Sequence, residues 1–84
     1  MIQVYTKPDC SYCDAAKRLL NERGVPFNEI RIGVDVIREE VVDMFPNHKT
    51  VPIIVEDGGV IGGYQQLNEY LNTRGDEEGQ LILG

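Results

Sequence analysis

The sequence predicts an α/β fold in which a four-stranded mixed sheet is flanked by helices, in the order β-α-β-α-β-β-α. Short runs rich in β-branched and aromatic residues alternate with stretches whose apolar residues recur at helical spacing. A helix between the first two strands predicts a parallel pair, and a glycine turn between the last two predicts an antiparallel pair. The 84 residues suffice for a single domain, which we expect to have a core over residues 1–74 and a tail over residues 75–84.

The first half of the chain contains two predicted strands and two predicted helices. Residues 2–6 are mostly β-branched or aromatic and precede a proline turn, which predicts the first strand. Residues 11–23 carry apolar side chains three and four positions apart, which predicts a helix that Gly24 ends. We expect the second strand over residues 25–32 and the second helix over residues 36–45.

The second half begins with a predicted hairpin. Residues 51–55 and 60–61 are β-branched runs on either side of a turn that contains two glycines. A third helix is expected after Gly62-Gly63 and is expected to end at Arg74-Gly75. The apolar residues 81–83 then either dock on the core or fray, and the sequence leaves both alternatives open.

The charge and hydropathy of the chain exclude several classes of function. The net charge of −6 disfavours nucleic-acid binding, which needs a surplus of Lys and Arg on one face. No apolar run approaches the roughly 18 residues of a membrane helix, and the first residues lack the charged and apolar blocks of a signal peptide. We therefore expect a cytoplasmic protein that binds neither nucleic acid nor membranes.

The two cysteines lie at the predicted junction of the first strand and the first helix, in Cys10-Ser11-Tyr12-Cys13. A Cys-x-x-Cys pair at this place is typical of a thioredoxin-like redox motif, because the N-terminus of a helix stabilises a thiolate. Two alternatives are weaker. Two cysteines are too few for a secreted disulfide scaffold, and a zinc site would have only His48 as a further soft ligand, so we expect no metal.

Four segments of the chain together resemble the glutaredoxin family in identity, order and spacing. They are Val4-Tyr5-Thr6-Lys7 before the cysteine motif, Ala16-Lys17-Arg18-Leu19-Leu20, Thr50-Val51-Pro52, and Ile61-Gly62-Gly63-Tyr64 followed by Leu67. The resemblance extends from Ile2 to about Leu71. It implies a thioredoxin fold and glutathione-dependent thiol-disulfide exchange.

The resemblance implies a role for each residue around the cysteine motif. Cys10 is the expected nucleophile, and Cys13, one helical turn later, is the expected resolving thiol. The pKa of Cys10 should fall below the free value of about 8.5 because of the helix N-terminus, with Lys7 adding to this effect and Asp9 opposing it. Tyr12 is expected to shield the sulfur and to line a glutathione groove.

The other two matching segments imply a binding surface for glutathione. By the resemblance, the bond between Val51 and Pro52 is cis, so that the backbone of Thr50-Val51 pairs with an extended thiol substrate. The N–H groups around Gly63 and Tyr64 would hold the γ-glutamyl carboxylate. Lys49 is either a solvated loop residue or a contact for the glycine carboxylate.

The chain departs from the family pattern at two places. Family members commonly have an acidic side chain just after the Gly-Gly-x segment, where it meets the ammonium of glutathione, whereas this chain has Gln65 and Gln66. We place Gln65 in the expected glutathione site, with altered affinity or selectivity. Ser11 replaces the usual proline between the first cysteine and the tyrosine, and this should alter the redox potential.

The expected function is that of a monomeric dithiol enzyme that reduces protein disulfides and glutathione mixed disulfides, with glutathione as its reducing co-substrate. Ribonucleotide reductase is a candidate client by family analogy only. Two alternatives remain. The protein could be a glutaredoxin-like electron donor that thioredoxin reductase re-reduces, or a carrier in which two chains hold a [2Fe-2S] cluster through Cys10 and glutathione.

Overall fold

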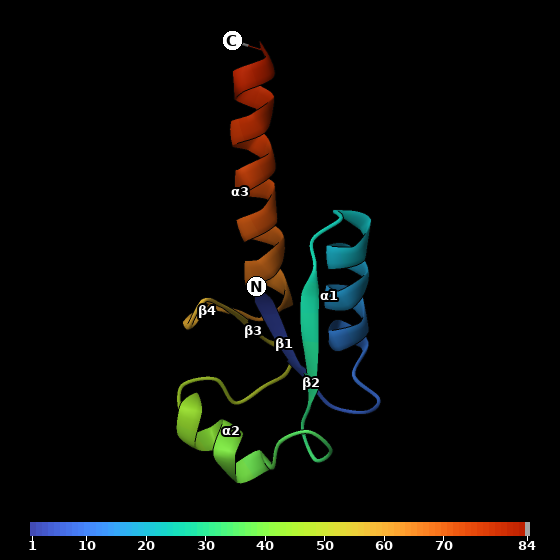
Figure 1. Ribbon diagram of the computed structural model, residues 1–84, viewed down its shortest axis with the longest axis vertical. Coiled ribbons are helices and arrows are strands. Elements are labelled where there is room, and N and C mark those ends of the chain that lie inside the picture. Colours follow the sequence, from blue (N-terminus) through green and yellow to red (C-terminus); the bar gives the residue numbers. More distant parts are fainter. Residues whose placement is uncertain (84) are drawn as a thin grey trace.

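The computed structural model describes the backbone of residues 1–83 and the side chains of residues 1–73. The elements follow the predicted order β-α-β-α-β-β-α (Figure 1). They are β1 (Ile2–Thr6), α1 (Ser11–Glu22), β2 (Phe27–Arg31), α2 (Arg38–Met44), β3 (Ile53–Glu56), β4 (Gly59–Gly62) and α3 (Tyr64–Leu83). Among the described residues, no helix combines the length and the apolar character needed to cross a membrane.

The four strands form one mixed sheet in the order β2-β1-β3-β4, which confirms the predicted sheet. β1 pairs parallel with β2 and antiparallel with β3, while β3 and β4 form the antiparallel hairpin. β1 and β3 occupy the centre, and their paired residues Val4 and Ile54 are fully buried. The edge strand β2 has polar residues at its exposed positions, as the mixed pattern of its sequence predicts.

The two faces of the sheet carry cores of different size. On one face, α1 and α3 pack against the strands in a cluster that includes Val4, Leu20, Ile54 and Leu67, all at most 1% exposed. On the other face, a smaller cluster joins Val41 of α2 to residues of β1 and β3. Alternate residues of a strand point to opposite faces, so β3 contributes to both clusters.

Helix α1 begins at the predicted residue and ends at Glu22, one residue before the predicted end. Cys10 precedes the helix in an extended conformation, and its Sγ accepts a hydrogen bond from the N–H of Cys13 at 3.1 Å. The buried face of the helix comprises Cys13, Ala16 and Leu20. Gly24 follows with a φ of +67°, the left-handed conformation that commonly ends a helix.

A polar contact joins α1 to the sheet next to the cysteine motif. The buried Thr6 hydroxyl donates to the Glu29 carboxylate at 2.8 Å, and the Lys17 ammonium lies 3.1 Å from the same oxygen. The Thr6 hydrogen bond is the main cause that lowers the pKa of Glu29, and Lys17 adds to the lowering against the opposing effect of burial. This contact ties β1, β2 and α1 together.

The predicted end of α3 at Arg74-Gly75 is wrong, because the helix continues to Leu83. A glycine inside a helix costs about 1 kcal/mol relative to alanine, which weakens a helix without ending it. No proline follows Gly75 to prevent continuation. The side chains of residues 81–83 lie outside the described ones, so the alternatives of docking and fraying stay predictions.

The start of α2 also differs from the predicted one. Val36 forms a parallel bridge with Ile32, and its carbonyl accepts the N–H of Gly33 at 2.7 Å. These contacts hold Val36 against the residues that follow β2, so Val36 is not part of the helix. Helix α2 therefore begins at Arg38, two residues later than expected. The other boundaries agree with the predictions or differ from them by one or two residues.

Candidate active site

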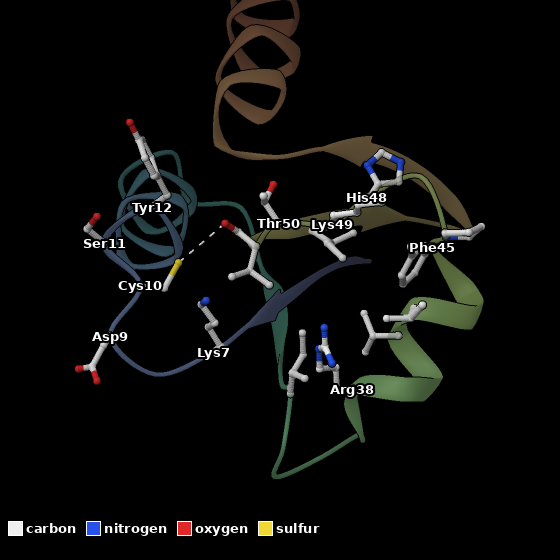
Figure 2. A pocket seen from close by; sticks show the side chains of 16 residues that line it. Lys7, Asp9, Cys10, Ser11, Tyr12, Arg38, Phe45, His48, Lys49 and Thr50 are labelled. Atoms are coloured by element: carbon white, nitrogen blue, oxygen red, sulfur yellow. Dashed lines mark hydrogen bonds between the residues drawn. The ribbon is translucent and has the colours of Figure 1, made fainter.

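The cysteine pair lies where β1 passes into α1, at one end of the sheet. Cys10 and Cys13 form a disulfide, with their Cα atoms 5.2 Å apart. The two sulfurs have different surroundings, because Cys13 is 1% exposed on the buried face of α1, whereas Cys10 is half-buried. Figure 2 shows Cys10 at the end of α1, next to an open pocket. Only Cys10 is therefore accessible to a substrate.

The backbone around Cys10 favours negative charge on its sulfur. The N–H of Cys13 points at Sγ, and the other first-turn N–H groups of α1 add the positive end of the helix dipole. Asp9 carries the nearest opposing charge in the sequence, and Figure 2 shows its carboxylate directed away from the sulfur. Once the disulfide is reduced, these groups can stabilise a Cys10 thiolate.

The segment Thr50-Val51-Pro52 faces Cys10 across the pocket. The bond between Val51 and Pro52 is cis, which confirms the prediction. The Cys10 Sγ lies 3.9 Å from the carbonyl oxygen of Val51, the contact marked in Figure 2. Pro52 is buried and Val51 is half-buried, so the Val51 backbone forms an edge beside the reactive sulfur.

A groove of about 900 Å³ extends from Cys10 along α2, and we call it the α2 groove. Its lining includes the predicted residues Lys7, Cys10, Tyr12, Thr50 and Val51, together with Asp9, Ser11, Ile32, Arg38, Val41, Val42, Phe45, Pro46, His48, Lys49 and Ile53. Three of these side chains are Lys or Arg and one is Asp, in a chain whose net charge is −6. The groove can therefore bind an anionic group on an otherwise acidic protein.

A second, smaller hollow lies on the other side of the same loop, at the start of α3. This α3 hollow measures about 290 Å³ and is lined by Asn47, His48, Lys49, Thr50, Pro52, Ile61, Gly62, Gly63 and Gln66. The N–H of Gly63 points to a side-chain acceptor, the Gln66 Oε1, at 3.0 Å. Gly62 has a φ of +132°, and a Cβ placed there would lie 2.8 Å from the Gln66 Cβ. The positive φ of Gly62 and the lack of space for a Cβ there both require a glycine at position 62.

The remaining predicted residues are brought together only in part. The Tyr12 side chain is exposed and its ring lies 6.1 Å from the Tyr64 ring, so the first turns of α1 and α3 meet beside Cys10. Gln65 is exposed, and among the described residues it has no hydrogen bond or ion pair. Gln66, the other glutamine of the departure, is the one that reaches Gly63.

Sequence reasoning missed the contribution of α2 to the site. Figure 2 shows the Arg38 guanidinium directed from α2 toward the groove, and Phe45 packs edge-on against Tyr5 at 5.2 Å. The helical spacing predicted an apolar face on α2, but no motif marks which loop that face approaches. Among the described residues, no group of three or more His, Cys, Asp or Glu side chains is placed to hold a metal ion.

Comparisons with known proteins agree with this geometry. Residues 2–61 match the family model described as Glutaredoxin. The chain is 38% identical to Glutaredoxin 3 of Escherichia coli (strain K12) over 74 residues, which is 88% of each chain. It superimposes on Glutaredoxin 1 from Francisella tularensis, solved with cacodylate, with a TM-score of 0.75 and 27% identity over 89% of this chain and 95% of the other.

A third relative has a different description. The glutaredoxin-like protein NrdH-redoxin from Escherichia coli, solved in relation to its thioredoxin-like activity profile, matches with a TM-score of 0.62 and 27% identity. That match covers 81% of this chain and 91% of the other. The family match, the shared fold and the paired cysteines at one helix N-terminus lead to one conclusion: the chain belongs to the glutaredoxin family and is a dithiol, glutathione-dependent disulfide oxidoreductase.

Proposed function

We propose that Cys10 is the nucleophile and Cys13 the resolving thiol of this glutaredoxin, acting on glutathione mixed disulfides and protein disulfides. The observation that carries the proposal is the difference in access between the two sulfurs. Cys10 is half-buried at the edge of the α2 groove, whereas Cys13 is 1% exposed behind it. A substrate disulfide can approach only Cys10, and Cys13 can then attack from within the helix.

The proposed reaction begins with the reduced enzyme. The Cys10 thiolate attacks the glutathione sulfur of a mixed disulfide, a Cys10-glutathione disulfide forms, and the substrate thiolate leaves and takes up a proton from water. A second glutathione thiolate then attacks the glutathione sulfur, which yields glutathione disulfide and restores the Cys10 thiolate. With a protein disulfide, the Cys10 thiolate attacks one client sulfur, and the other client sulfur leaves as a thiolate that takes up a proton from water. Cys13 loses its proton to water and attacks the Cys10 sulfur of this Cys10–client disulfide, so that the client leaves as a dithiol and a Cys10–Cys13 disulfide forms. Two glutathione molecules then reduce that disulfide and leave as glutathione disulfide.

The proposed glutathione position uses both hollows. The cysteine of glutathione would pair with the Val51 backbone, which lies 3.9 Å from the Cys10 sulfur. The glycine carboxylate would lie among the basic groups Lys7, Arg38 and Lys49 of the α2 groove. The γ-glutamyl carboxylate would lie at the N-terminus of α3, near Gly63.

The residues around this position have supporting roles in the proposal. Tyr12 and Tyr64 would flank the γ-glutamyl end, Thr50 would line both hollows, and the buried Pro52 would hold the Val51 edge in place. Gln65, which is exposed and has no polar contact among the described residues, stays in the proposed set at the place of the family's acidic side chain, with altered affinity or selectivity for glutathione. The effect of Ser11 on the redox potential stays a prediction.

Protein disulfides are proposed as the second class of substrate. The α2 groove continues past the cysteines along apolar residues that include Val42, which is 52% exposed. An extended client segment could cover these residues while its cysteine faces Cys10. Ribonucleotide reductase stays a candidate client by family analogy, and we propose that the enzyme acts as a monomer in the cytoplasm, where thiols are kept reduced.

Re-reduction by thioredoxin reductase is the second candidate, and one observation favours it. The N–H of Gly63, which would hold glutathione, already bonds to Gln66. The two routes are separated by supplying the oxidised protein with glutathione and glutathione reductase, or with thioredoxin reductase, and following NADPH consumption. No observation on the described residues favours the [2Fe-2S] alternative, so it stays a prediction from the sequence.

The experiment that tests the proposed function is turnover of a small glutathione mixed disulfide by the wild type, Cys10→Ser and Cys13→Ser. We expect Cys10→Ser to lose activity by at least about a thousandfold, because the attacking thiolate is gone. Cys13→Ser should keep turnover of the mixed disulfide and lose reduction of protein disulfides. An active Cys10→Ser enzyme would show that the nucleophile is assigned wrongly.

A further inference from the structure

We infer that Gln66 is a specificity-determining residue whose side chain competes with the γ-glutamyl carboxylate of glutathione for the N-terminus of α3. The inference rests on the proposed function, since it concerns the site at which that carboxylate would bind. It names a residue that lowers the preference of this enzyme for glutathione over thiols that lack the γ-glutamyl group.

The first support is the hydrogen bond at the start of α3. The helix begins at Tyr64, so Gly63 is its cap residue and Gln66 is the third residue of its first turn. The Gln66 Oε1 accepts the N–H of Gly63 at 3.0 Å, the contact that the third residue makes in a capping box. The chain thus supplies its own acceptor to a donor that an anionic ligand would use.

The second support is the position of the rest of the Gln66 side chain. Its Cβ and Cγ lie only 2.8 Å from the point that a Cβ on Gly62 would occupy, so the side chain is folded back over the backbone of Gly62 and Gly63. Gln66 also lines the α3 hollow, together with Thr50 and Pro52 of the opposite loop. The Gln66 Oε1 thus occupies the acceptor position at the Gly63 N–H, one of the groups that line this hollow.

The third support is that this cap can open. Gln66 is exposed, and its hydrogen bond to the Gly63 N–H is a local contact at the protein surface. Its bond joins two neutral groups, whereas a carboxylate would make a charge-assisted bond of roughly twice the strength. The carboxylate therefore displaces the amide, but the binding energy is reduced by the bond that is broken.

The consequence is a selective weakening of one class of substrate. A thiol compound with a γ-glutamyl group must displace Gln66, and a thiol without that group leaves the cap closed. Removal of the acceptor should therefore strengthen binding of the first class by about fivefold, the factor that corresponds to one net hydrogen bond of about 1 kcal/mol. The second class should be unaffected.

The test uses two mixed disulfides of one peptide thiol, one formed with glutathione and one with cysteinylglycine, which lacks the γ-glutamyl group. Gln66→Met keeps the length of the side chain and removes its amide acceptor. We expect this variant to lower the KM for the glutathione substrate about fivefold, with kcat and both constants for the cysteinylglycine substrate unchanged. Gln66→Ala should behave in the same way and serves as the second variant.

Asn68→Leu is the matched control, because Asn68 lies on the same helix, loses its amide to an apolar group of the same size, lines neither hollow and has no polar contact among the described residues. It should leave the ratio of the two KM values at the wild-type level. If Gln66→Met lowers the melting temperature and leaves that ratio unchanged, Gln66 is only a helix cap and the inference is overturned. A wild type that turns over neither mixed disulfide would instead contradict the proposed function.

Discussion

The active site has two walls: the α2 wall is helix α2 with the α2 groove, and the α3 wall is the start of helix α3 with the α3 hollow. The two walls differ in the core that supports them and in the groups that they present to a substrate. The α3 wall rests on the larger core, where Leu67 and Ile54 are fully buried against α1 and the central strands. The α2 wall rests on the smaller core through Val41. Among the residues whose side chains are described, no α2 side chain makes a hydrogen bond or an ion pair with another element.

The two walls also differ in the chemical groups that they offer to a ligand. The α2 groove offers side-chain charges, such as those of Lys7 and Arg38, over an apolar surface. The α3 hollow offers fixed backbone N–H groups, and the first of them is already bonded to Gln66. A backbone site needs a rigid support to keep its geometry, whereas side-chain cations adapt to ligands of different shape. The α2 wall thus suits varied clients, and the α3 wall suits one ligand group.

The largest effect that tests this comparison comes from two adjacent residues of β3. Ile53 and Ile54 are both at most 2% exposed, but Ile53 faces the α2 core and Ile54 faces the α1 and α3 core. Replacing Ile54 with alanine should cost about 4 kcal/mol of unfolding free energy, because the surrounding core cannot collapse into the cavity. The same change at Ile53 should cost about 2 kcal/mol, since α2 packs on the smaller core and can shift to fill part of the cavity.

The measurement is urea unfolding of both variants and the wild type, with the slope of the transition checked for two-state behaviour. The pair is its own control, because the residue type, the strand and the burial are matched. An Ile53→Ala variant that loses as much free energy as Ile54→Ala would show that the two walls are equally well supported.

A second prediction concerns the charge of the α2 groove. Arg38→Ala removes a guanidinium that points into the groove, so we expect the KM for a glutathione mixed disulfide to rise about three- to fivefold, the range for one ion pair near a surface. Added salt should shrink the difference, because it screens the pair.

Arg18→Ala is the control for Arg38→Ala. Arg18 is an exposed arginine on α1 that lines neither hollow, so its loss changes the net charge by the same amount without touching the site. Steady-state kinetics at low and high ionic strength measure both variants. Equal KM values for the two would mean that Arg38 acts only through the overall charge.

The parts of the fold that the sequence predicted are those governed by local patterns. β1 is predicted over its observed residues because its β-branched run ends at a proline turn, and α1 begins where Cys10 can cap it. The end of α3 was missed because a helix stop at Gly75 depends on a balance of about 1 kcal/mol rather than on a steric clash. The start of α2 was missed because Val36 pairs with Ile32 across a turn.

The site was predicted in part for the same physical reason. The cysteine motif and the Thr50-Val51-Pro52 segment are contiguous, so their chemistry is visible in the sequence. Arg38 enters the site only because α2 packs across the sheet, which is a long-range contact without a local signal. The choice between Gln65 and Gln66 depends on helix phase, since only the third residue of the first turn can reach back to Gly63.

The smallest predicted effect concerns the contact that holds α1 beside the sheet, for which α2 has no counterpart among the described side chains. The pKa of Glu29 is lowered, so its carboxylate stabilises the fold fully above its ordinary value of 4.5, and this stabilisation is lost as the pH falls through the folded pKa. Glu29→Gln keeps an acceptor for the Thr6 hydroxyl and removes only the charge. We therefore expect a loss of about 0.5 to 1 kcal/mol of unfolding free energy at pH 7.

The dependence on pH distinguishes this contact from a change in packing. The difference in unfolding free energy between wild type and Glu29→Gln should shrink as the pH falls below 4.5 and vanish once Glu29 is protonated in the folded protein. Glu22→Gln, at the exposed end of α1 and without an ion pair among the described residues, should show no such difference at any pH. If Glu29→Gln still has a lower unfolding free energy than the wild type at low pH, the side chain contributes through its shape and not through its charge. The two walls would then not differ in electrostatic support.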